Sequence, residues 1–416
     1  MTLRPPADES ATNGSLIPDP EGPPAPAHEW RGLLLDSART FWSVDEVCEI
    51  LDLMARYRLN RLHWHLTDDA AWRFDVPGYA RVVEVGAHLP REPFTWYTNV
   101  DPGKRDDVIG SAPEGSTSGW YTDEDVTRVV EHAARLGIRV MPEMDLPGHM
   151  AAVIKAYPEL GDPALADLPP SEWTHRNDLL WPSPAADDFL RAALQKVCAL
   201  FPFPVVHIGG DECDYRVWEA DGALMQQMAD EGVEDARALQ GRFTSLARAT
   251  LTDLGRGIAA WDEVTETPCV GDELIFGWRE GVGVPAAQGS GNPWVLADAD
   301  VLYLNRLGGP VESERAGMYG TISVRDILDI EVPDDDQLQG IQAAAWCEFM
   351  PDRAALHYHL FPRLLAVAEL AWCGSVTAAD FEGRLSQEAA WLAEHGVHGR
   401  PIDKHTWRST PRPTAR

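Results

Sequence analysis

Short apolar runs alternate with longer amphipathic stretches along most of the chain. The run 205–208 is brief and rich in β-branched residues, which is typical of a buried strand. Within residues 60–66, leucine and tryptophan alternate with histidine, so His63 and His65 should share the opposite face of a strand. Ser43 and Thr122 each precede a helical pattern with acidic residues in its first turn. The pattern therefore predicts alternating strands and helices.

The number of these segments indicates one architecture. The candidate strands are 31–36, 60–66, 138–145, 205–208, 258–263, 273–278, 301–305 and 341–348. Further helices are predicted over 122–136, 184–200, 236–254, 357–372 and 378–395. Eight strands separated by helices predict a (β/α)8 barrel.

The two ends of the chain differ from this pattern. Residues 1–28 hold seven prolines and no apolar core of a signal peptide, which predicts a disordered lead-in. The barrel then occupies 29–400, with a long excursion over its mouth around 89–120, and 401–416 form a tail. No stretch has the roughly 20 apolar residues of a membrane span. We therefore expect a soluble, cytoplasmic protein.

Charge and cysteine content narrow the functional class. Lys and Arg number 35 against 66 Asp and Glu, a net charge of −31, which disfavours nucleic acid and anionic membranes as partners. The six cysteines are scattered without the paired spacing of a zinc or redox site. We expect no metal or organic cofactor, and the sequence leaves a homodimer open.

Reactive side chains gather at the C-terminal ends of the predicted strands, the rim that carries the active site of such barrels. They are Asp68, His149, Asp211, Glu212, Trp261, Trp278, Tyr303, Trp346 and Glu348. Asp211 and Glu212 follow a Gly-Gly pair that permits a sharp turn. Adjacent carboxylates in a chain with 16 tryptophans indicate sugar chemistry. The alternative is a solvated Asp-Glu turn that closes an ordinary strand.

The motifs as a set resemble family 20 of the glycoside hydrolases, the β-N-acetylhexosaminidases, over about residues 30–375. The segments that carry the resemblance, in family order, begin with Arg31-Gly32, run through the segments 62–69, 142–149 and 207–212, and end with Trp261-Asp262-Glu263, Gly277-Trp278-Arg279, Tyr303-Leu304-Asn305 and Ala345-Trp346-Cys347-Glu348. The family commonly has an α+β domain before the barrel, and we expect a stand-alone barrel here.

The resemblance implies a retaining reaction in which the substrate's own acetamido oxygen is the nucleophile. Glu212 would protonate the leaving oxygen and then deprotonate water, Asp211 would hold the acetamido N–H, and Tyr303 would bond the acetamido carbonyl. Asp68 and His149 would form a relay pair behind the acid.

The resemblance also implies residues that surround the terminal sugar. Trp261, Trp278 and Trp346 would form apolar walls, whereas Arg31 and Glu348 would bond sugar hydroxyls. An ion pair at the barrel rim is the alternative for Arg31, and a satisfied histidine at a helix start is the alternative for His149.

One departure from the family bears on substrate choice. Many members carry aspartate two residues after the tyrosine, whereas this chain has Asn305 followed by Arg306. Because alternate residues of a strand share a face, Asn305 should point into the pocket beside Tyr303. We hypothesise that the pocket tolerates a 6-sulfate on the terminal sugar. The alternative is that Asn305 bonds the same hydroxyls as the aspartate.

The sequence therefore predicts an exo-acting β-N-acetylhexosaminidase that removes terminal β-linked N-acetylglucosamine or N-acetylgalactosamine from a glycan or amino-sugar oligosaccharide. Two alternatives stay open. One is a relative that releases disaccharides, and the other is a catalytically weak sugar-binding protein. The intact Asp211, Glu212 and Tyr303 argue against the binding protein.

Overall fold

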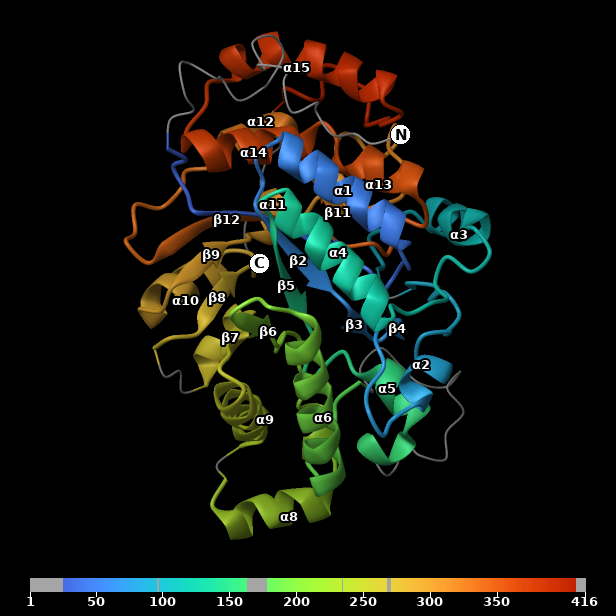
Figure 1. Cartoon of the computed structure of the whole chain (residues 1–416), viewed down its shortest axis with the longest axis vertical. Coiled ribbons are helices and arrows are strands. Elements are labelled where there is room, and N and C mark those ends of the chain that lie inside the picture. The colour runs from blue at the N-terminus through green and yellow to red at the C-terminus, as the bar shows by residue number, and fades with distance from the viewer. Residues whose placement is uncertain (1–24, 96, 163–177, 234, 268–270, 409–416) are drawn as a thin grey trace.

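Eight parallel strands close into a barrel, and helices surround it (Figure 1). The computed structural model describes residues 25–95, 97–162, 178–233, 235–267 and 271–408. The strands pair around the barrel in the order β1-β12-β9-β8-β7-β6-β5-β2. Their bounds are β1 Trp30–Asp36, β2 Arg61–His65, β5 Arg139–Glu143, β6 Val205–His207, β7 Gly257–Trp261, β8 Leu274–Gly277, β9 Trp294–Leu296 and β12 Leu338–Ala345. This confirms the predicted (β/α)8 barrel.

Two small sheets lie outside the barrel. They pair β3 Thr67–Asp68 with β4 Ala71–Trp72, and β10 Arg306–Leu307 with β11 Met318–Thr321. The larger helices are α1 Val44–Arg56, α3 Pro102–Ser111, α4 Asp123–Arg135, α6 Pro184–Leu200, α8 Gly222–Glu231, α9 Ala236–Asp253, α10 Gly283–Ser290, α13 Arg353–Leu360, α14 Arg363–Cys373 and α15 Ala378–Glu394. The shorter ones are α2 Arg81–Glu84, α5 Ala151–Ala156, η1 Pro158–Leu160, α7 Arg216–Glu219, η4 Asp262–Glu266, α11 Ala299–Leu302 and α12 Val324–Leu328.

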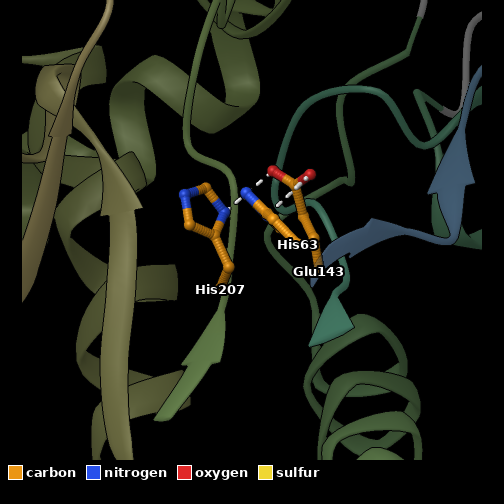
Figure 2. A group of neighbouring side chains, drawn as sticks. All are labelled: His63, Glu143 and His207. Atoms are coloured by element: carbon orange, nitrogen blue, oxygen red, sulfur yellow. Dashed lines mark ion pairs between the residues drawn. The ribbon is translucent and has the colours of Figure 1, made fainter. Parts of the chain in front are cut away.

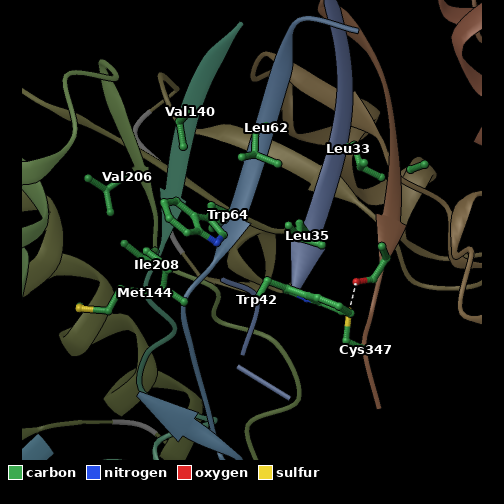
Figure 3. Close-up of a cluster of buried hydrophobic side chains, with 14 of the residues drawn as sticks. Leu33, Leu35, Trp42, Leu62, Trp64, Val140, Met144, Val206, Ile208 and Cys347 are labelled. Atoms are coloured by element: carbon green, nitrogen blue, oxygen red, sulfur yellow. Dashed lines mark hydrogen bonds between the residues drawn. The ribbon is translucent and has the colours of Figure 1, made fainter. Parts of the chain in front are cut away.

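The barrel strands are buried on both faces because one face meets the helices and the other fills the barrel. Leu62 and Trp64 of β2 belong to the large cluster between strands and helices, together with Leu33 and Leu35 of β1 (Figure 3). Leu34 belongs instead to the cluster inside the barrel. The histidines of β2 are also buried on that inner side, where they contact polar groups of β5 and β6. The alternation predicted for residues 60–66 is therefore confirmed.

Helix starts follow the predicted capping residues. Ser43 caps α1 and Thr122 caps α4, and each side chain accepts a hydrogen bond from the backbone N–H three residues later. The predicted helix over 357–372 is wrong as a single element. The structure has α13 and α14 there, separated at Pro362, because proline lacks the N–H that a continuous helix needs.

The strand predicted at 301–305 is also wrong. Residues 299–302 form the short helix α11, and the barrel strand of this segment is β9, seven residues earlier. Asp298 explains the difference because its side chain caps α11 by accepting the Asp300 N–H. Tyr303 still reaches the barrel, because it forms an isolated parallel bridge with Ala344 of β12.

The described residues include no helix long and apolar enough to cross a membrane. The predicted disordered lead-in lies largely outside the described residues, as does the end of the predicted tail. The excursion around 89–120 contains α3, and Lys104 of α3 donates to the carbonyl oxygens of Val311 and, at 2.6 Å, Glu314.

Replacing Phe276 with alanine should destabilise the barrel strongly. Phe276 is fully buried and its ring meets those of Trp30, His63 and His207 at centroid distances of 5.1–5.5 Å. We expect the free energy of unfolding to fall by about 3–5 kcal/mol, because the mutation leaves a cavity. Urea unfolding followed by tryptophan fluorescence measures the change. Ile402→Ala, at an exposed site, is the control and should stay within about 0.5 kcal/mol of the parent.

Candidate active site

The turn after β6 presents Asp211 and Glu212 at the barrel mouth. Gly209 and Gly210 have φ of +62° and +91°, and a Cβ at Gly209 would overlap the Asp145 carboxylate. The same Asp145 carboxylate stabilises the turn, because its Oδ1 accepts a hydrogen bond from the Gly210 N–H at 3.0 Å. Glu212 itself has φ +52°, a conformation that side chains rarely adopt. The Gly-Gly pair is therefore required by the shape of this turn.

His149 lies between two pairs of carboxylates. Its Nδ1 is 3.3 Å from Asp69 Oδ2 and 3.6 Å from Asp68 Oδ2. Its Nε2 is 3.7 Å from one carboxylate oxygen of Asp211 and 3.7 Å from one of Glu212. The structure thus brings together four predicted residues, and it places Asp69, which was not predicted, closer to His149 than Asp68.

Burial and charge set the ionisation of this group. Burial alone would lower the pKa of His149, but the neighbouring Asp68, Asp69 and Asp211 raise it well above its usual value. Burial raises the pKa of Asp211 to about 6, with His149 opposing the rise and Glu212 adding to it. We infer an imidazolium that faces both acids.

Tyr303 lies near the same carboxylates. Burial, with a contribution from Asp211, raises the pKa of the Tyr303 phenol well above its usual value. The phenol therefore keeps its proton and can donate a hydrogen bond.

Arg39 is a site residue that sequence reasoning missed. Its Nη2 lies 2.7 Å from Asp68 Oδ2, and its guanidinium stands over the Trp346 ring at 5.2 Å. Burial would raise the pKa of Asp68, but Arg39 and His149 lower it, so this carboxylate stays ionised. The available signal was position, because Arg39 follows the C-terminal end of β1, where the rim of the barrel lies.

Arg31, which the sequence suggested as a sugar contact, is not brought to this group. Its guanidinium donates to the carbonyl oxygens of Arg58 at 2.8 Å and His28 at 2.7 Å, and it stands over Trp372 at 4.9 Å. The reason is that Arg31 begins β1, so it lies at the end of the barrel opposite the mouth.

The site is a cavity of about 80 Å³ with aromatic walls. Trp278 and Tyr303 stack with centroids 6.0 Å apart and planes at 8°, and Trp346 lies 6.0 Å from Tyr303. Trp261 is buried and packs against Trp278 and Trp346 at 6.4 and 6.0 Å. The lining residues are Arg39, His65, Asp68, Tyr97, His149, Asp211, Glu212, Trp278, Tyr303, Asn305, Met318, Trp346 and Glu348.

Glu348 carries two hydrogen bonds on its buried carboxylate. Tyr97 donates its hydroxyl to Oε1 at 2.8 Å, and the Asn305 amide donates to Oε2 at 3.4 Å. Asn305 Oδ1 is buried and, within the described part of the chain, accepts no hydrogen bond. Tyr97 lies in the excursion and was not predicted, since no strand end or motif marks it.

Arg306 turns away from this cavity. Its Nη2 pairs with Glu280, and its Nη1 donates to the Tyr319 carbonyl at 3.2 Å. It begins β10, a short strand paired with β11 outside the barrel. Of the two residues in the altered motif, only Asn305 therefore lines the site.

A second polar group lies deeper, inside the barrel. The Glu143 carboxylate contacts His207 Nδ1 at 2.8 Å and His63 Nε2 at 3.2 Å (Figure 2), and it also bonds His65 Nδ1. Among the described residues, three groups of side chains have the spacing of metal ligands: His63-Glu143-His207, Asp68-Asp69-His149 and Asp145-His149-Asp211. The same spacing is accounted for by the ion pairs themselves, so we assign no metal to any of them.

Known proteins are similar to this chain in sequence. The chain is 32% identical to a beta-hexosaminidase of Porphyromonas gingivalis over 94% of its own length and 50% of that relative. It is 31% identical to a beta-hexosaminidase of Vibrio furnissii, with coverage of 88% and 59%. The chain thus spans only half to three fifths of these relatives.

A solved structure is similar as well. It is the exo β-N-acetylglucosaminidase of Vibrio harveyi in complex with N-acetylglucosamine, with a TM-score of 0.78 and 30% identity. The match covers 91% of this chain and 60% of that one. The family model for the catalytic domain of glycosyl hydrolase family 20 matches residues 28–375, most of the chain. The resemblance that the motifs indicated is therefore confirmed, and the chain belongs to glycosyl hydrolase family 20.

Proposed function

We propose that this chain is an exo-β-N-acetylhexosaminidase that removes one terminal β-linked N-acetylglucosamine or N-acetylgalactosamine with retention of configuration. The observation that carries the proposal is Asp211 Oδ1, a buried oxygen that accepts no hydrogen bond from any described residue. It lies in an aromatic cavity beside Glu212. An acetamido N–H is the donor that this oxygen lacks. The relatives named beta-hexosaminidase and the N-acetylglucosamine bound to the Vibrio harveyi enzyme support the same substrate.

In the first step the acetamido oxygen attacks C1 and the bond from C1 to the leaving oxygen breaks. Glu212 gives its proton to that oxygen. Asp211 accepts the acetamido N–H and stabilises the positive charge that develops on the oxazolinium ring. Tyr303 donates its hydroxyl to the acetamido oxygen, which fixes the direction of attack.

In the second step water attacks C1 from the face that the leaving group vacated. Glu212 takes the water proton, and the bond from C1 to the acetamido oxygen breaks. Two inversions at C1 give overall retention. The side chain of Glu212 is 52% exposed, so it is open to both the leaving group and the incoming water.

His149 and the carboxylates behind it act as positioning residues. The imidazolium lies 3.7 Å from a carboxylate oxygen of each acid and lowers the pKa of Asp211, and Asp68 and Asp69 hold its other nitrogen. This extends the predicted Asp68-His149 relay to a third residue.

The remaining lining residues suit the sugar itself. Trp278, Tyr303 and Trp346 provide apolar surface for the acetamido methyl and the ring face. Glu348, Asn305 and Arg39 offer acceptors and donors for the outer hydroxyls.

A 6-sulfated terminal sugar is a second candidate substrate. Its support is the Asn305 amide, which adds no negative charge to the cavity. Against it, Asn305 Oδ1 lacks a donor among the described residues, which a hydroxyl supplies and a sulfate does not, and Arg306 would have to leave Glu280. We therefore propose neutral sugars as the main substrates and the sulfated sugar as a tolerated one.

Replacing Glu212 with glutamine should lower the turnover of p-nitrophenyl N-acetylglucosaminide by about 10²-fold or more, because the general acid and base is lost. Glu219→Gln, at an exposed residue of α7, is the matched control and should keep parental turnover. Steady-state kinetics measure both. Binding of the sugar by the parent without turnover would favour the binding protein instead.

The activity should fall as the pH drops through about 6. Asp211 must be ionised to stabilise the oxazolinium, and its pKa in the free protein is raised to about 6, so kcat/KM loses activity on the acid side of that pH. Asp211→Asn should be much less active at all pH values and should lack this limb. A parent profile that is flat between pH 5 and pH 7 would contradict the assignment.

Asn305→Asp tests the sulfate hypothesis. The new carboxylate would lie near Glu348 and repel a sulfate, so kcat/KM on the 6-sulfated glucosaminide should fall about tenfold more than on the neutral substrate. The ratio of the two kcat/KM values is the measurement. If the parent does not cleave the sulfated sugar, or if both substrates lose equally, the hypothesis is wrong.

A further inference from the structure

The excursion between β4 and α4 brings a polar group into the cavity that no motif of the family marks. Tyr97 lines the cavity, and its hydroxyl donates to Glu348 Oε1 at 2.8 Å. Glu348 lines the same cavity, where Asn305 donates to it and Arg39 is a neighbouring positive charge. We propose that Tyr97 is a specificity-determining residue, and this inference rests on the proposed function. Its hydroxyl holds the Glu348 carboxylate in the orientation in which that carboxylate accepts the outer hydroxyls of a single terminal sugar.

The position of Tyr97 is set by a small apolar cluster of its own. Phe94, Val100, Ala316 and Phe349 are buried together, and Tyr97 packs against them. The Tyr97 ring lies 5.5 Å from that of Phe349, the residue next to Glu348. The same packing therefore holds both the donor and the loop that carries the acceptor.

Polar contacts tie the excursion down on either side of this cluster. Before it, Arg91 Nη2 donates to Thr40 Oγ1 at 3.0 Å and Ser116 Oγ at 3.3 Å. After it, Lys104 donates to carbonyl oxygens of the opposite segment, including that of Glu314 at 2.6 Å. These contacts attach the described residues of the excursion to the barrel on both sides of Tyr97.

The Glu348 carboxylate is oriented by donors on both of its oxygens. Tyr97 occupies one lone pair of Oε1, and Asn305 occupies one of Oε2 at 3.4 Å. A carboxylate has about four lone-pair sites, so hydroxyls of a ligand can donate to it as well. On a pyranose whose C1 and C2 lie at Glu212 and Asp211, the hydroxyls at C3, C4 and C6 lie at the opposite edge of the ring, and the proposal places them at Glu348. An oriented carboxylate there suits a sugar with free outer hydroxyls.

Loss of the Tyr97 hydroxyl has a direct electrostatic consequence. Burial raises the pKa of Glu348, whereas Arg39 and the Tyr97 hydrogen bond lower it. Without the hydroxyl, the pKa of Glu348 rises further. Only the ionised carboxylate accepts two sugar hydroxyls. In the variant, therefore, the loss of substrate binding on acidification should begin at a higher pH than in the parent.

Tyr97→Phe tests the proposal, with Tyr57→Phe as the matched control. Tyr57 also donates to a carboxylate at 2.8 Å, that of Glu388, but it lies at the end of α1 and does not line the cavity. We expect Tyr97→Phe to raise KM about tenfold with a smaller change in kcat, to move the acid-side rise of KM to higher pH, and to alter the kcat/KM ratio between the glucosaminide and the galactosaminide. Tyr57→Phe should change none of these.

The outcomes separate the two proposals. If the parent does not cleave either sugar, the proposed function itself fails. If the parent is active and Tyr97→Phe keeps the parental KM, pH profile and epimer ratio, Tyr97 does not determine specificity. If both tyrosine variants change the kinetics alike, the effect is a general loss of stability, and the proposal is overturned.

Discussion

The site depends on the contacts of the Glu143 carboxylate, because they connect β5 with β2 and β6 inside the barrel. The carboxylate hydrogen-bonds His65 Nδ1 of β2. Its oxygens also lie 3.2 Å from His63 Nε2 of β2 and 2.8 Å from His207 Nδ1 of β6 (Figure 2). A fully buried carboxylate is stable only with such partners. Burial would lower the pKa of His65, but Glu143 and Asp68 raise it to about 10, so His65 supplies the compensating charge.

This link fixes the strands whose ends carry the reactive groups. β2 continues into Asp68 and Asp69, β5 into Asp145 and His149, and β6 into the Gly-Gly turn. From the barrel interior to the mouth the charges alternate in sign: Glu143, His65, Asp68, then His149, and finally the two acids. The alternation allows many ionisable groups to be buried together in a chain whose net charge is −31.

The sequence predicts most of this arrangement because two kinds of signal are local. The alternation in β2 and the glycines before Asp211 are properties of neighbouring residues, and both are found in the structure. Contacts between residues far apart in the chain leave no comparable local pattern in the sequence. Asp69 and Asp68 are equivalent in sequence, and only the fold places Asp69 nearer to His149.

The errors have physical reasons as well. Arg31 lies at the start of β1 and Arg39 follows its end, so the direction of β1 decides which of them reaches the mouth. The strand expected at 301–305 is replaced by the helix α11, because Asp298 caps a helical turn there. Tyr97 was out of reach of any pattern, because its place depends on packing between the excursion and the residue after Glu348.

The backbone conformation of two residues has a consequence for engineering. His149 and Glu212 have φ of +53° and +52°, a region that costs a residue with a side chain on the order of 1 kcal/mol or more. Glycine would relieve that strain at either position, but it would remove a side chain that the proposed function requires. A substitution that stabilises the fold at these two positions would therefore be expected to cost activity. Improvements in robustness are better sought in the outer ring of helices, where neither backbone is involved.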